Sequence, residues 1–164
     1  MLDQLIKLVE QHAGSAIVNN SAIPNQHNNA AIKEVAQQIF NGLQNHANSG
    51  NLSQLTNLFQ GNASNLSSNP IVSQLISSVS SSVANKFGVS PQAAQSMASN
   101  LLPSVMNQLV NKTNNPNDNS FDLGNMMRTF TGNSSFDVSG MLNQLSGGSG
   151  GGVGGMLGKL FGGK

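Results

Sequence analysis

Apolar residues recur at intervals of three and four along the first 113 residues, which is the spacing of one face of an α-helix. Five such apolar stripes are separated by polar or glycine-containing stretches. In chain order, their members are Leu2, Leu5, Ile6 and Val9; Ile32, Val35, Ala36, Ile39, Phe40 and Leu43; Leu52, Leu55, Leu58 and Phe59; Ile71, Leu75, Ile76, Val79, Val83 and Phe87; and Met97, Ala98, Leu101, Leu102, Val105, Met106 and Leu109. We therefore expect an all-α fold, with a multihelical domain of about five helices over residues 1–113.

Glycine, proline and small polar residues predict where these helices begin and end. Gly14 is expected to stop the first helix, and a polar loop is expected over residues 14–28. Between the last two stripes, Gly88 can take a left-handed conformation, Ser90 can cap a helix, and Pro91 suits a first helical turn. These three residues predict a tight turn between the fourth and fifth helices.

Residues 114–164 are predicted to form a linker followed by a glycine-rich tail of tandem short helices. Residues 111–120 contain no apolar residue, which is typical of a linker. Beyond them, a unit of about fifteen residues repeats: a cap, an apolar stripe, then a glycine. The three stripes are Leu123, Met126, Met127 and Phe130; Val138, Met141, Leu142 and Leu145; and Val153, Met156, Leu157 and Leu160.

The repeat units are predicted to be amphipathic helices of about two turns. Asp122 and Asp137 precede the first two stripes as caps, whereas Gly152 stands in that place in the third. Helices below about 12–15 residues are marginal alone in water, so each unit must dock on the helical domain or on a partner. We take the stripes of the first two units as candidate interaction residues: Leu123, Met126, Met127, Phe130, Val138, Met141, Leu142 and Leu145.

Charge is scarce in this chain and argues against several classes of partner. Charged residues make up 8% of the sequence and the net charge is +1, with no cluster of Lys or Arg to neutralise phosphates. A nucleic-acid partner is therefore not expected. The chain has no Cys, so disulfide and thiol chemistry are excluded. Neither a signal peptide nor a stretch long enough to span a membrane is recognisable, and a cytoplasmic location is expected, with envelope association left open.

Each candidate catalytic or metal-binding pattern in the sequence lacks a residue or element that its chemistry requires. Glycine-dense matches in the tail lack the preceding strand that nucleotide or nucleophile motifs require. Asp118, Ser120 and Asp122 resemble the start of a calcium loop, but Leu123 and Thr129 then stand where its glycine and glutamate belong. We therefore expect no metal, no cofactor and no enzymatic activity.

The titratable residues of the helical domain likewise form no recognisable set. His12, His27 and His46 share no metal-ligand spacing. Glu34 has no partner close by in the sequence for acid–base chemistry. Solvated positions at helix ends and on helix faces explain these residues more simply.

Four segments carry a resemblance to a known family. They are the Phe87-Gly88-Val89-Ser90 turn, the Leu101-Leu102-Pro103 run, the Phe121-Asp122-Leu123 start of the first unit and the ending at residues 156–163. In these the chain resembles the YidB-like bacterial family of uncharacterised helical proteins, domain of unknown function family 937. The resemblance implies a multihelical fold. It implies no activity, cofactor or catalytic residue.

The expected function is that of a non-enzymatic helical interaction or structural module, which binds protein partners or self-associates through its short amphipathic helices. The alternative is a peripheral membrane or envelope-associated protein. In that case the glycine-rich C-terminal segment, with Met156, Leu157, Leu160 and Phe161 beside Lys159, would lie at a membrane surface.

Overall fold

The computed structural model describes residues 1–61 and 63–132. These residues form six α-helices joined by short 3-10 and π-helical turns, with no strand among them. The helices are α1 (Leu2–Ala13), α2 (Asn28–Asn48), α3 (Leu52–Gln60), α4 (Pro70–Phe87), α5 (Pro91–Thr113) and α6 (Leu123–Thr131). The all-α class and the five predicted helices are confirmed, and α6 coincides with the first repeat unit. None of the helices in this part of the chain has both the length and the apolarity needed to cross a membrane.

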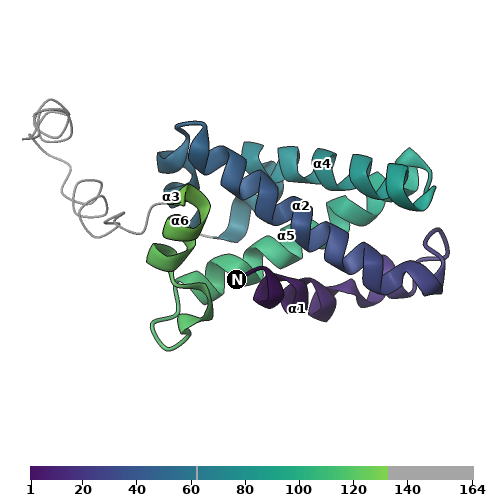
Figure 1. Cartoon of the computed structure of the whole chain (residues 1–164), viewed down its shortest axis with the longest axis horizontal. Coiled ribbons are helices and arrows are strands. Elements are labelled where there is room, and N and C mark those ends of the chain that lie inside the picture. Colours follow the sequence, from purple (N-terminus) through teal and green to yellow (C-terminus); the bar gives the residue numbers. More distant parts are fainter. Residues whose placement is uncertain (62, 133–164) are drawn as a thin grey trace, which may run out of the picture.

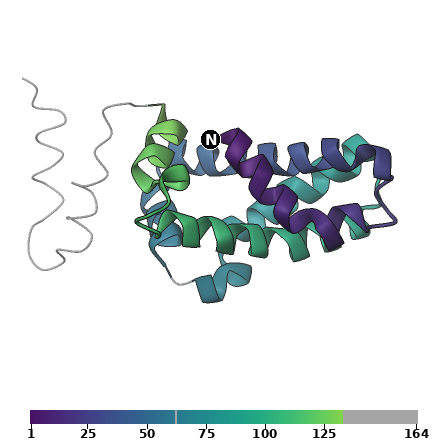
Figure 2. The ribbon, with the colours of Figure 1, turned by 90° about the horizontal axis from the view of Figure 1, so that it is seen from below.

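Four long helices make up the body of the fold. Helix α1 packs against α2, α2 against α4, α4 against α5, and α5 back against α1, so that the four surround a common core. Figures 1 and 2 show the two short helices, α3 and α6, at one end of this bundle, while the α1–α2 and α4–α5 connections lie at the other. The short helices therefore cover an end of the bundle rather than one of its long sides.

Local capping sets several of the helix ends. The Asn69 side chain accepts a hydrogen bond from the backbone N–H of Ile71 (2.9 Å) at the start of α4. Gly88 ends that helix with a φ of 65°, a left-handed conformation that glycine adopts without steric cost. The Ser90 hydroxyl then caps α5, and Pro91 occupies its first turn. The predicted turn between α4 and α5 is confirmed.

Helix α1 ends at Ala13 with Gly14 as its C-cap, as predicted, but the chain does not turn into an irregular loop there. Gly14 has right-handed helical angles (φ −49°, ψ −59°), and the chain continues through a π-helical turn, Gly14–Val18. This turn buries Ala16 and Ile17 in the core, and Ile23 is buried in the segment that follows. The burial of these side chains outweighs the low helix propensity of glycine, so only the later part of residues 14–28 is irregular.

Gly42 allows α2 and α4 to approach closely. A Cβ atom at this position would lie 2.3 Å from Cδ2 of Leu75 on α4, well inside van der Waals contact. Leu75 is buried in the core, so an added methyl group would require its side chain to shift. The α2–α4 contact therefore depends on the absence of a side chain at Gly42.

The first repeat unit belongs to the same core as the five preceding helices. Phe121, Met126, Met127 and Phe130 are buried together with side chains from α1 to α5. This differs from the predicted boundary after residue 113, which placed the whole repeat region outside the helical domain. The reason is physical: the apolar stripe of α6 is covered by the bundle, so the domain includes the chain up to Gly132 at least.

Two alanine substitutions are predicted to change stability in opposite directions. Gly14→Ala should raise the free energy of unfolding by about 0.5–1 kcal/mol, because the position is helical and nothing lies within 4 Å of an added Cβ. Gly42→Ala should lower it by about 1 kcal/mol or more, because the clash with Leu75 exceeds the gain in helix propensity. Urea denaturation measures both free energies, and destabilisation by Gly14→Ala would mean that residue 14 does not have a right-handed helical conformation.

Candidate interaction site

Helix α6 shows how one repeat unit is built. The Asp122 carboxylate accepts a hydrogen bond from the backbone N–H of Asn125 (3.0 Å) and so caps the first turn. Gly132 ends the helix in a left-handed conformation with a φ of 67°. Between them lie nine helical residues whose buried members are Met126, Met127 and Phe130. The predicted sequence of cap, apolar stripe and glycine is confirmed for this unit.

Side chains from three long helices meet α6. The ring of Phe130 lies edge-on to that of Phe40 on α2, with 5.5 Å between the ring centroids and 61° between the planes. The Oγ1 atom of Thr113, at the end of α5, lies 3.5 Å from Sδ of Met126, while its hydroxyl donates to the carbonyl oxygen of Leu109 (2.8 Å). At the start of α1, Gln4 lines a shallow hollow together with α6 residues. We call the surface marked by Gln4, Phe40 and Thr113 the α6 docking surface.

The candidate interaction residues of the first unit are not exposed anchors. Met126, Met127 and Phe130 are at most 1% exposed, and Leu123 is partly buried against the same core. These side chains pack on the protein's own helical domain, because that contact removes the stripe from water within a single chain. The four candidates of the second unit, Val138, Met141, Leu142 and Leu145, lie outside the described residues.

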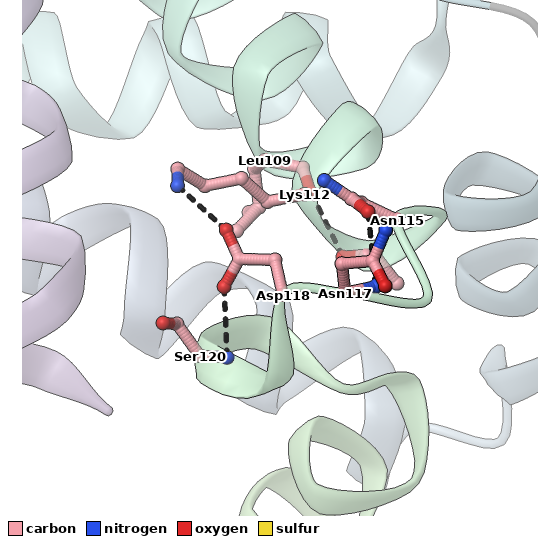
Figure 3. A network of polar contacts seen from close by, with 7 residues as sticks. Leu109, Lys112, Asn115, Asn117, Asp118 and Ser120 are labelled. Carbon is pink, nitrogen blue, oxygen red and sulfur yellow. Dashed lines mark hydrogen bonds and ion pairs between the residues drawn. The ribbon is translucent and has the colours of Figure 1, made fainter.

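The connection between α5 and α6 is folded rather than a free linker. The Nζ atom of Lys112 lies 2.8 Å from one carboxylate oxygen of Asp118, and the backbone N–H of Ser120 donates to the other oxygen (3.0 Å; Figure 3). A 3-10 turn over Asn119–Phe121 follows and buries the Phe121 ring. The predicted linker is therefore a hydrogen-bonded connection that directs the chain into α6.

Asparagine side chains complete this connection. The Asn114 side chain donates to the carbonyl oxygen of Phe59 (2.8 Å), which ties the end of α5 to α3. The Asn115 side chain accepts from the backbone N–H of Asn117 (3.0 Å; Figure 3). Asn and Asp readily form such short-range bonds to backbone, so a wholly polar sequence can still be ordered.

The residues that resemble a calcium loop have structural roles. Asp118 is paired with Lys112, and Asp122 caps α6. Hydrogen bonds from the Lys112 amine and from Ser120 lower the pKa of the Asp118 carboxyl from 3.8 to about 2. Over residues 1–61 and 63–132, no three His, Cys, Asp or Glu side chains are gathered as metal ligands would be.

Glu34 has partners that sequence reasoning missed. Its carboxylate, 9% exposed on α2, accepts hydrogen bonds from Lys86 and Ser82 on α4 and from Gln38 (2.8 Å). Burial alone would raise the pKa of Glu34, but these hydrogen bonds outweigh it and the pKa is lowered. Lys86 lies 52 residues away in the sequence, so no local pattern could have indicated the pair.

The three histidines lie at helix ends, as their sequence positions suggested. His12 and His46 are in the last turns of α1 and α2, and His27 ends the 3-10 turn that precedes α2. The His27 ring contacts that of Phe87, with 5.8 Å between the centroids.

The geometry defines an all-α bundle whose sixth helix is docked on one end. The model of one family, described as "Bacterial protein of unknown function (DUF937)", matches residues 69–164, and the chain belongs to this family. This confirms the family indicated by the sequence motifs, although not the YidB-like label. No curated protein and no solved structure matches the chain. The match begins at Asn69, the cap of α4, and so includes α4, α5, α6 and all three repeat units.

The ion pair in the α5–α6 connection leads to a pH prediction. Because the pKa of Asp118 is lowered to about 2, its carboxylate stabilises the fold above its ordinary pKa of 3.8, and this stabilisation is lost as the pH falls toward 2. A carboxyl NMR titration should therefore place Asp118 near 2. Lys112→Met should raise the pKa of Asp118 toward 3.8. Lys86→Met, which removes the partner of Glu34, should leave the pKa of Asp118 unchanged. An unchanged pKa of Asp118 in Lys112→Met would contradict the ion pair between Lys112 and Asp118.

Proposed function

We propose that this protein is a non-enzymatic helical module that self-associates or binds a protein partner through its second repeat unit, at Val138, Met141, Leu142 and Leu145. One observation carries the proposal. The first unit has the same pattern of cap, stripe and glycine, and three of its four stripe residues are at most 1% exposed against the bundle. The pattern is therefore that of a docking helix.

Burial energies explain why a second unit of this kind favours binding. An apolar side chain of this size gains about 1.5–3 kcal/mol when it moves from water into a packed interior. Four such side chains on two helical turns supply enough to fold the helix and to hold it on a surface. An amphipathic helix in a groove is recognised through anchors at these spacings.

The described surface contains few other apolar positions. Val18 is the exposed large apolar side chain in this part of the chain, at 43%. With 8% charged residues in the whole sequence, electrostatic attraction also contributes little to association. The apolar stripe of the repeat is therefore the feature best suited to binding a second molecule.

A test introduces charge into the stripe. The full chain should show a concentration-dependent increase in mass by sedimentation equilibrium, and Met141→Asp with Leu142→Asp should weaken that association by tenfold or more, because two anchors can no longer be buried. Asn143→Asp adds a single negative charge on the polar side of the unit, and it should leave the association unchanged because no anchor is altered. A heterologous partner would instead be captured by the unaltered chain and by Asn143→Asp, but not by the double variant.

Three outcomes would contradict the proposal. Association and capture could be absent at all concentrations, or they could persist equally in the double variant. Alternatively, binding confined to anionic lipid vesicles, lost on Leu160→Asp with Phe161→Asp, would favour the membrane-associated function instead.

A further inference from the structure

The second repeat unit matches α6 position by position. Adding fifteen to each residue number of the first unit gives the corresponding residue of the second. The cap, the first methionine and the terminal glycine are identical, and the other anchors are similar: Asp122 and Asp137, Leu123 and Val138, Met126 and Met141, Met127 and Leu142, Phe130 and Leu145, Gly132 and Gly147. The features by which α6 begins, docks and ends are thus present twice in the chain.

The α6 docking surface can accept these anchors. Met141 has the same thioether that Met126 places beside the Thr113 hydroxyl in α6. Leu145 fills the place of Phe130 with an apolar side chain but lacks the edge-to-face contact with Phe40, which makes it about two- to tenfold the weaker occupant. The second unit therefore fits the surface, with α6 preferred.

The outward side of the helix is compatible as well. Asn125, Arg128 and Thr129 are exposed on α6, and the corresponding residues of the second unit are Gly140, Asn143 and Gln144. No apolar or bulky side chain would be moved from the docked side to the solvent side. The third unit is a poorer candidate, because Gly152 replaces the capping aspartate.

We infer that the α6 docking surface has an alternative occupant, the second repeat unit of the same chain (residues 137–147). The unit begins at Asp137, six residues after the end of α6 in the same chain, so its effective concentration at the surface is high. When the second unit is docked, the residues of α6 become part of the loop between α5 and that unit. Closing this longer loop costs conformational entropy, so this arrangement is the minor one, with about 0.1% to a few per cent of molecules.

This inference extends the proposed function, because it states when each unit is available to a partner. When α6 is docked, the second stripe is free to bind. When the second unit is docked, the stripe of α6 takes that role. Because two units compete for one docking surface, one unit is always undocked and available to bind a partner.

Disulfide trapping can detect the minor arrangement, since the chain has no native Cys. Gln4 and Thr129 line the same hollow beside α6, and Gln144 corresponds to Thr129. In the full chain, Gln4→Cys with Gln144→Cys should form an intramolecular disulfide at low protein concentration. The matched control is Gln74→Cys with Gln144→Cys, because Gln74 is exposed on α4 and lines a different hollow between α2 and α4. It should cross-link at the rate of random collision.

The two helix caps give the decisive comparison. Removing the cap of α6 with Asp122→Ala should raise the Gln4–Gln144 trapping rate about fivefold, and Asp137→Ala should lower it about fivefold, because each cap stabilises only its own helix. Asp137→Ala leaves the described fold untouched, so it remains informative if Asp122→Ala loosens the bundle. A trapping rate equal to the Gln74 control, or insensitive to Asp137→Ala, would overturn the inference.

The trapping rate reports which unit occupies the surface, whereas sedimentation reports association. Cap-sensitive trapping without association would leave the alternative occupant in place and overturn the proposed function. Association that depends on Met141 without cap-sensitive trapping would support the proposed function and overturn the inference of an alternative occupant.

Discussion

A helix of nine residues is too short to persist in water, and the architecture of this protein follows from that constraint. Both α3 and α6 have this length, and both bury an apolar stripe at the same end of the bundle (Figure 1). The four long helices supply the surface on which they fold. In α6, the Asp122 cap and the Gly132 stop define the ends, but burial of Met126, Met127 and Phe130 provides the stabilisation.

Two ion pairs connect elements of the described fold. Glu34 and Lys86 join α2 to α4, and Lys112 and Asp118 fix the connection that leads into α6. Neutral side chains also connect elements, as in the hydrogen bond from the Asn114 amide at the end of α5 to the Phe59 carbonyl in α3. The family match covers the repeat units and α4 to α6, whereas the part of the docking surface on α1 and α2 precedes it.

Local patterns predicted the five helices and the turn at Gly88, Ser90 and Pro91, because spacing, capping and backbone conformation are properties of neighbouring residues. The Glu34–Lys86 pair and the docking of α6 could not be predicted, since each joins segments distant in the sequence. Gly14 shows the same limit: α1 ends there as predicted, but the π-helical turn that follows, in which Ala16 and Ile17 are buried, had no local signal. For the candidate site, the sequence indicated the pattern of α6 and the need to dock, while the structure alone shows that its anchors face the bundle.

Amide hydrogen exchange on the full chain tests most directly whether docking holds α6 in place. Met126, Met127 and Phe130 should exchange about a hundredfold or more slowly than in an unstructured peptide, and Phe40→Ala should reduce that protection while Val79 in α4 keeps its own. Exchange of the α6 amides at the rate of an unstructured peptide, or protection unaffected by Phe40→Ala, would contradict the account.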